Sequence, residues 1–224
     1  MDNNKTMIVE TDSKGIPLKH VGYPDSMSVA TFYVVGNVVM GGIGLAMAWF
    51  LAYNPTEATR AIVDAKIGIL VEHNLGWLFL GIFFVKLLQV PLHIILGEAR
   101  KASKVAVPNQ HVYRIMGSEG SRLGYVLMET EGEHGAFNRA QRALMNYHET
   151  FPTLVLQYIA ASWVFPFEAF LCVMVWAATR CIAAVGYRSS AWGRFNGNVP
   201  GLLAISTIQG MVLIASIKAL LLSA

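Results

Sequence analysis

Long apolar stretches separated by polar segments dominate the pattern of this chain. Five stretches stand out: 29–53, 74–97, 150–167, 169–187 and 195–217. Lys86 and Arg180 are the only charged residues within them. A helix needs roughly 20 apolar residues to cross a bilayer core, and the strict alternation of a membrane barrel is absent. The pattern therefore predicts five membrane-spanning helices.

Composition supports this assignment and excludes other classes. Hydrophobic residues make up 54% of the chain and charged residues only 14%, whereas soluble domains carry about 25% charged residues. The formal net charge of +3 is small, and no stripe of Lys and Arg indicates nucleic-acid binding. Two cysteines exclude a disulfide scaffold or a cysteine-rich zinc module, and no metal site is expected.

The connections between the apolar stretches differ in length. Residues 1–28 are polar, lack the order of a cleavable signal and are interpreted as a flexible tail. Pro166 separates the third and fourth stretches and predicts a tight helical hairpin. Residues 98–138 carry many charges and several glycines, which indicates a long exposed loop.

The distribution of basic residues predicts an orientation in the membrane. Five spans place the chain ends on opposite sides. The side of the N-terminus collects most of the Lys and Arg residues, whereas the other holds only Arg60, Lys66 and Lys218. Because basic residues concentrate on the cytoplasmic side, we expect the N-terminus, the long loop and the loop between the last two spans to face the cytoplasm.

Four polar residues enter the third span on one helical face. Asn138, Arg142, Asn146 and Glu149 follow one another at intervals of four, four and three residues. A charge at the bilayer centre costs roughly 2.5–3.5 kcal/mol, so such residues face protein or water. One interpretation is that Arg142 and Glu149 only hold helices together. The other is a site in which Arg142 binds a carboxylate and Glu149 an ammonium group.

A second polar set follows in the fourth span and the loop after it. Arg180, Tyr187 and Arg194 are spaced seven residues apart. Taken singly, Arg180 is explained by an ion pair, to Glu149 for example, and Tyr187 by a place at the membrane interface. Lys86, in the second span, is interpreted as a paired or snorkelling residue. The arrival of several cationic groups at one membrane face instead favours an anion-binding site.

These motifs resemble those of the membrane-associated proteins in eicosanoid and glutathione metabolism. The pattern is Arg-x-x-x-Asn-x-x-Glu-x-x-Pro over 142–152, followed by Arg180, Gly186-Tyr187 and Arg194. The resemblance covers about residues 74–222. It implies an all-α integral membrane protein: a four-helix bundle of the microsomal glutathione transferase type, plus an extra N-terminal transmembrane helix at 29–53.

The resemblance also implies roles for individual residues. Arg194 would be the catalytic residue, because a guanidinium beside a thiol favours the thiolate and cannot itself lose its proton. Ala183 stands where several family members have a tyrosine that contacts glutathione. The residues implied to bind glutathione, as a co-substrate, are Lys101, Arg142, Asn146, Glu149, Arg180 and Tyr187.

The implied activity is a membrane-bound glutathione S-transferase, with glutathione peroxidase activity as a second reaction. The thiolate would attack a lipophilic electrophile or lipid that arrives through the bilayer. The resemblance further implies a homotrimer in the endoplasmic reticulum or another organelle membrane. The alternative is a non-catalytic lipid-binding scaffold or an accessory subunit. The glycines of the 29–53 helix predict that it packs against another membrane protein.

Overall fold

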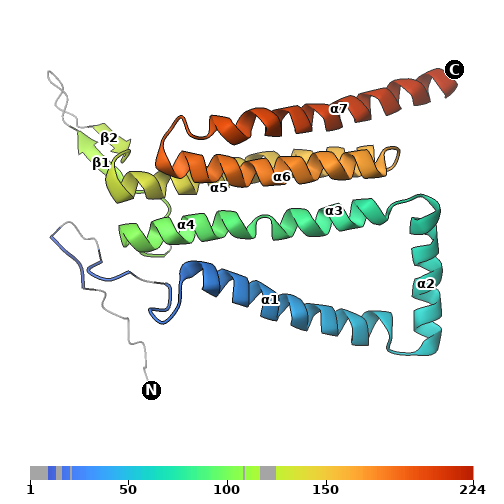
Figure 1. Ribbon diagram of the computed structural model, residues 1–224, viewed down its shortest axis with the longest axis horizontal. Helices are drawn as coiled ribbons and strands as arrows, with labels where there is room; N and C mark the ends of the chain where they lie inside the picture. The colour runs from blue at the N-terminus through green and yellow to red at the C-terminus, as the bar shows by residue number, and fades with distance from the viewer. Residues whose placement is uncertain (1–9, 14–16, 21, 108, 117–124, 224) are drawn as a thin grey trace.

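The computed structural model describes residues 10–13, 17–20, 22–107, 109–116 and 125–223, and these are mostly helical (Figure 1). The elements follow in the order α1 (Val29–Met47), η1 (Ala48–Tyr53), α2 (Glu57–Glu72), α3 (Gly76–Leu87), α4 (Val90–Ser103), β1 (Tyr113–Met116), β2 (Tyr125–Met128), α5 (Gly132–Ser162), α6 (Pro166–Ser189) and α7 (Phe195–Ser223).

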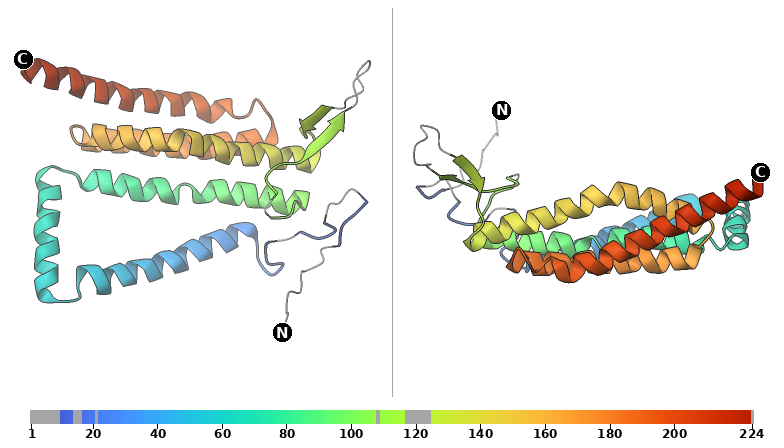
Figure 2. Two further views of the ribbon diagram at one scale, coloured as in Figure 1. Left: turned by 180° about the vertical axis from the view of Figure 1, so that it is seen from behind. Right: turned by 90° about the horizontal axis from the view of Figure 1, so that it is seen from above.

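The architecture is an all-α membrane bundle with an additional helix at its side. The joined helices α3 and α4 pack against α5 and α6, α7 packs against the same two helices from the other side, and α1 touches this bundle through α4 (Figures 1 and 2). Four helical stretches are long and apolar enough to span a membrane: α1 with η1, α3 with α4, α6, and α7. The chain is therefore a multi-pass integral membrane protein. Of the five predicted spans, the third, at 150–167, falls largely in α5, which is not among these four stretches.

Aromatic residues of α5 fix the core of the bundle. Tyr147 is 1% exposed, lies 5.0 Å from the Trp176 ring and donates a hydrogen bond of 3.1 Å to the Val85 carbonyl. Further along the same helix, the Tyr158 hydroxyl donates a hydrogen bond of 2.9 Å to the Trp77 carbonyl. These contacts join α3, α5 and α6, so the apolar face of α5 points inward and its polar face is left for other partners.

The second predicted span is divided into two helices. α3 ends at Leu87 and α4 begins at Val90, with Pro91 in its first turn. A proline removes one backbone donor and clashes with the carbonyl four residues earlier, which here belongs to Leu87. The break therefore lies where Pro91 places it, inside the apolar stretch that the pattern treats as one helix.

Part of the predicted exposed loop has regular structure. β1 and β2 pair antiparallel, with Tyr113 opposite Met128 and Met116 opposite Tyr125, while residues 117–124 lie outside the described residues. Both strands are rich in aromatic and aliphatic residues and flank a glycine-containing segment, which is a hairpin pattern. The long loop of the prediction is thus an extension of α4, a hairpin and the start of α5.

Asn138 anchors this hairpin to α5 instead of facing a ligand. Its side chain is 2% exposed. The amide nitrogen donates to the carbonyls of Val112 and Glu129, both at 2.8 Å, and the amide oxygen accepts from the Val112 N–H at 2.9 Å. The side chain of Asn138, the first residue of the predicted polar stripe, therefore makes its hydrogen bonds to backbone groups.

Replacing Asn138 with leucine is expected to lower the free energy of unfolding by about 1–3 kcal/mol, because partly buried backbone groups of Val112 and Glu129 lose their partner. The measurement is thermal unfolding of the purified protein in detergent. Asn37→Leu is the control, since the Asn37 amide bonds only its own helix, at the Tyr33 carbonyl. Equal melting temperatures for the two variants would contradict the anchoring role of Asn138.

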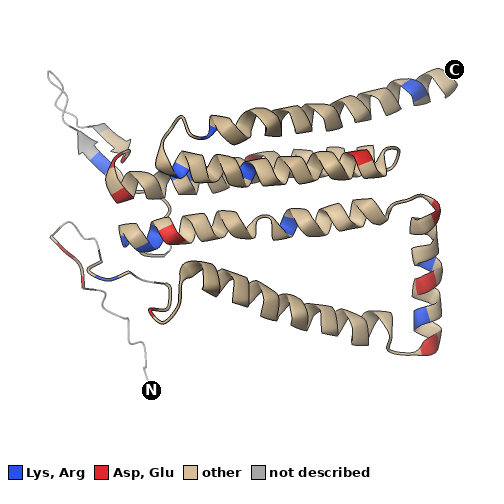
Figure 3. Cartoon of the chain, in the orientation of Figure 1, with Lys and Arg blue, Asp and Glu red and all other residues tan. Residues whose placement is uncertain are grey.

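Helix α2 lies across one end of the bundle and connects α1 to α3 (Figures 1 and 2). Among the described residues, charges gather at the two ends of the bundle and on α2 (Figure 3). The described N-terminal segment, the hairpin and the α6–α7 loop share the other end (Figure 1). These parts lie together as the charge distribution predicts, and their cytoplasmic orientation stays a prediction.

Candidate functional site

Four of the predicted site residues line one small pocket at the hairpin end of the bundle. Asn146 comes from α5, Arg180 and Tyr187 come from α6, and Arg194 lies in the loop before α7. The remaining lining residues are Ala143, Ala183, Ala184 and Asn198. The spacing along α5 and α6 predicted which residues share a face, and helix packing brings those two faces together.

Arg180 is the innermost charged residue of this pocket. Its Nη1 lies 3.4 Å from the Oδ1 of Asn198 on α7, and its guanidinium carbon lies 5.7 Å from the centre of the Trp176 ring. Its Nε is buried and has no hydrogen-bond partner among the described residues. A buried donor without a partner is costly, so the Nε–H of this guanidinium is free to donate a hydrogen bond to a ligand.

Arg194 is held at the pocket by close backbone packing. Gly186 of α6 and Gly193 of the loop approach so closely that a β-carbon on either would overlap the backbone of the other. This contact places the Arg194 guanidinium carbon 5.4 Å from the centre of the Tyr187 ring. The Arg194 carbonyl accepts a hydrogen bond from the Asn198 N–H at 3.1 Å, in the first turn of α7.

Arg142 and Glu149 form an ion pair with each other. Arg142 Nη1 lies 3.0 Å from Glu149 Oε1, and both side chains are about half exposed, at 43% and 53%. The suggested pairing of Arg180 with Glu149 is wrong, because Glu149 is occupied by Arg142 and Arg180 turns to Asn198. Exposed pairs of this kind contribute little stability, so a ligand group can replace either partner of the pair at little cost.

A larger pocket of about 330 Å³ adjoins the small one and shares Tyr187 with it. Arg142 and Arg139 line it together with Glu129. The backbone N–H groups of Glu131 and Thr130, at 3.0 and 2.8 Å, lower the pKa of the Glu129 carboxyl. The wall of the larger pocket therefore carries two cations and one carboxylate that is ionised at neutral pH.

Two predicted residues, Lys101 and Glu149, line neither of the two pockets, and two residues were missed. Lys101 sits in the last turn of α4 and lines neither of these pockets. Asn198 was missed although it follows Arg194 by four residues, the spacing that signals a shared helical face. Arg139 precedes Arg142 by three residues, and its Nη1 donates to the Thr130 carbonyl at 2.6 Å.

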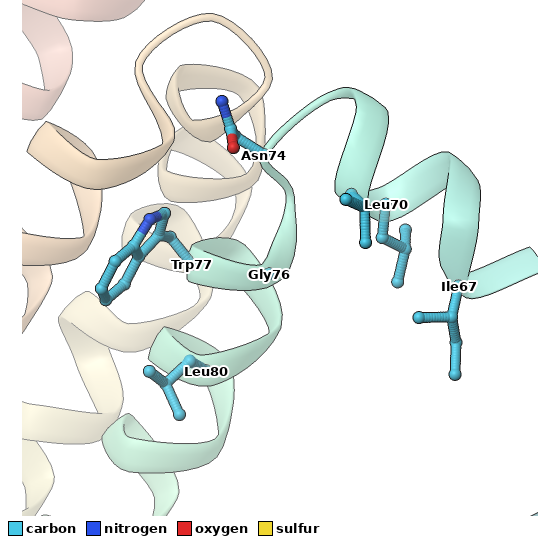
Figure 4. Close-up of a pocket in the computed structure, with 7 residues that line it drawn as sticks. Ile67, Leu70, Asn74, Gly76, Trp77 and Leu80 are labelled. Atoms are coloured by element: carbon cyan, nitrogen blue, oxygen red, sulfur yellow. The ribbon is translucent and has the colours of Figure 1, made fainter. Parts of the chain in front are cut away.

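A separate pocket of about 420 Å³ lies between α2 and α3 at the opposite end of the bundle (Figure 4). Its lining is almost wholly apolar, with Leu70, Trp77 and Leu80 among the contributors, and it holds no charged side chain. Within the described ranges, no three His, Cys, Asp or Glu residues lie close enough to hold a metal ion. The chemistry-bearing groups thus concentrate at the hairpin end.

Comparison with known proteins identifies the group to which this bundle belongs. None of the curated proteins compared with the chain matches it. The profile of the MAPEG family, the membrane-associated proteins in eicosanoid and glutathione metabolism, matches residues 76–214. This range begins with α3, ends within α7, includes every residue of the small pocket and leaves out α1 and α2. The chain therefore belongs to the MAPEG family.

Proposed function

We propose that the protein binds glutathione at the hairpin end of the bundle and transfers its thiolate to a lipophilic electrophile. Membership of the MAPEG family supports a glutathione-related membrane function in general. The observation that carries the specific proposal is the unpartnered Nε of Arg180 in a pocket that Arg194 also lines. Two guanidinium groups in one pocket favour an anionic ligand.

The charges of glutathione match those of the site. Glutathione carries two carboxylates, one ammonium group and a thiol. Arg142 and Arg180 are suited to the carboxylates, and Glu149 is suited to the ammonium once it leaves Arg142. Asn146 can donate to or accept from the peptide groups.

Arg194 would stabilise the reacting sulfur. A free thiol has a pKa near 8.5, and an adjacent guanidinium favours the ionised form. The thiol proton leaves to water, and the sulfur lone pair forms a bond to the electrophilic carbon. The electrophile is neutralised by departure of its leaving group or by uptake of a proton, and the product is a thioether. Tyr187, beside Arg194, is placed to donate a hydrogen bond to the sulfur.

The size of the small pocket implies a further participant. Its free space within one chain is about 10 Å³, which is about the minimum for a single water molecule. A tripeptide would therefore lie mainly in the adjoining space and along the open side of the bundle. We propose that a neighbouring copy covers that side, as in the homotrimer that the family resemblance implies.

The test is calorimetric titration of the detergent-solubilised protein with glutathione, combined with ultraviolet absorbance of the bound thiolate. Binding with a thiolate signal at neutral pH is the expected result. S-methylglutathione, in which the thiol is blocked, is expected to bind without that signal. If neither peptide binds, the proposed function is wrong.

A second candidate is a non-catalytic member that binds lipid or supports a larger membrane complex. Ala183 favours it, because this pocket residue replaces a tyrosine that contacts glutathione in several family members. A stable assembly that copurifies with the protein and buries α1, together with an absence of glutathione binding, would support this candidate. Glutathione turnover that persists after removal of residues 1–53 would count against it.

A further inference from the structure

The guanidinium of Arg194 differs from the others in how it is held. Among the described residues, its side chain contacts aromatic rings and forms neither a hydrogen bond nor an ion pair. Every other arginine in that part of the chain contacts a carbonyl, amide or carboxylate oxygen: Arg60, Arg100, Arg114, Arg139, Arg142, Arg180 and Arg188. Arg194 therefore keeps its position by a different kind of contact.

Two aromatic rings provide that contact. The guanidinium carbon of Arg194 lies 5.4 Å from the centre of the Tyr187 ring on α6 and 5.5 Å from the centre of the Phe195 ring at the start of α7. Both distances are within the reach of about 6 Å that cation–π contacts have. Because the two rings belong to different helices, the guanidinium is fixed where α6 and α7 meet.

The Phe195 ring is itself supported by Trp192. The two rings stack with centres 5.6 Å apart and planes at 24°, and the Phe195 N–H donates to the Trp192 carbonyl at 3.1 Å. Neither Trp192 nor Phe195 lines the small pocket that Arg194 lines. The effect of Phe195 on a ligand in that pocket would therefore pass through Arg194.

This arrangement leaves the N–H groups of Arg194 free. A ring face attracts the cation as a whole, whereas a carboxylate or carbonyl oxygen occupies individual N–H donors. A neighbouring carboxylate would also cancel part of the positive field that favours a thiolate. Arg142 shows the contrast, since it must leave Glu149 before it can bind a ligand. Arg194 needs no such exchange.

We propose that Phe195 is a positioning residue for the reaction of the glutathione thiol. Together with Tyr187, it holds the Arg194 guanidinium at the pocket and leaves its N–H groups to the sulfur. The inference rests on the proposed function, because it takes the thiolate as the partner of Arg194. It adds a residue outside the pocket whose aromatic ring is required, so that an aliphatic side chain cannot replace it.

The test replaces Phe195 with leucine, which remains apolar but has no ring face. Thiolate absorbance is followed against pH for glutathione bound to the full-length protein in detergent. An exposed cation–π contact corresponds to a factor of about two to five in an equilibrium. Phe195→Leu should lower the thiolate fraction at pH 7 by this factor, because the apparent pKa of the bound thiol rises by roughly 0.3–0.7. An unchanged pH profile overturns the proposal.

Control variants separate positioning from a structural effect. Phe195→Tyr keeps a ring and should keep the pH profile of the unchanged protein, whereas Phe195→Met, a second variant without a ring, should behave as Phe195→Leu does. Phe167→Leu should have no effect. Phe167 is 43% exposed against 45% for Phe195, and it packs on Trp77 at the opposite end of the bundle.

The blocked peptide S-methylglutathione tests the site for general damage. It has no thiolate to stabilise, so Phe195→Leu should bind it as tightly as the unchanged protein does. An equal loss of affinity for both peptides would show that the substitution distorts the site and would overturn the positioning role.

The double variant Arg194→Ala/Phe195→Leu shows whether Phe195 acts through Arg194. Its thiolate fraction should equal that of Arg194→Ala alone, since the ring then has no guanidinium to hold. A further loss of about two- to fivefold in the double variant contradicts the proposal.

The unchanged protein distinguishes this inference from the proposed function. If it binds no glutathione, or binds it without a thiolate signal, the proposed function fails and the role of Phe195 fails with it. If it gives the thiolate signal and Phe195→Leu gives the same signal at every pH, only the role of Phe195 is refuted.

Discussion

Replacing Arg194 with alanine is expected to remove most of the conjugation activity near neutral pH. If the guanidinium lowers the thiol pKa by about two units from about 8.5, its loss reduces the thiolate fraction about 25-fold at pH 7. The measurement is the thiolate absorbance of bound glutathione, followed together with the conjugation rate across pH. The thiolate fraction of the variant should rise with pH and approach that of the unchanged protein above about pH 9.

Two further variants separate this effect from a structural one. Arg194→Lys keeps a positive charge beside Tyr187 and should restore part of the thiolate signal. Arg188→Ala removes a nearby arginine that pairs with Glu98 at 2.9 Å and lies outside the pocket. Because such exposed pairs are worth about 0–1 kcal/mol, conjugation should persist. A thiolate signal in Arg194→Ala equal to that of the unchanged protein would refute the role of Arg194.

Substituting alanine for Gly197 should open the bundle at the site. A β-carbon at this position would overlap the Thr179 carbonyl oxygen and the Ala183 backbone nitrogen of α6. Backbone atoms cannot rotate aside as a side chain can, so α7 must move away from α6. We expect a loss of about 1–3 kcal/mol in the free energy of unfolding, together with weaker glutathione binding because Asn198 moves with α7.

Gly210→Ala is the matched control in the same helix. Nothing lies within 4 Å of a β-carbon built at Gly210. Alanine is a better helix former than glycine by about 1 kcal/mol, so this variant should be unchanged or more stable. Thermal unfolding in detergent compares the two. Equal melting temperatures would mean that α6 and α7 are not as tightly packed at Gly197 as described.

The apolar pattern predicted the four stretches that are long and apolar enough to span a membrane, because the required hydrophobic length is set by the bilayer alone. It did not predict the break at Pro91, since apolar residues continue on both sides of it. Helix α2 was also missed. Its charges recur among apolar residues, and only its place between two spans shows that it lies across the end of the bundle.

Helical spacing predicted which site residues share a face, but not which group each one meets. Asn146 and Arg180 converge as expected, because their helices pack face to face. Asn138 lies on the same stripe, but its side chain is hydrogen-bonded to the backbone of Val112 and Glu129. The partner of Arg180 comes from α7, which no pattern within α6 could identify.

The isolation of α1 also has a consequence for biogenesis. The ribosome makes α1 before the other helices, and the spanning stretch of α1 has none of its most apolar window buried in the folded chain. Insertion of this helix therefore depends mainly on lipid, and its contacts with α4 add to it only near its first residues. Val29 meets Gly97 only after α4 has been synthesised, so α1 enters the bilayer before the bundle of α3 to α7 forms beside it.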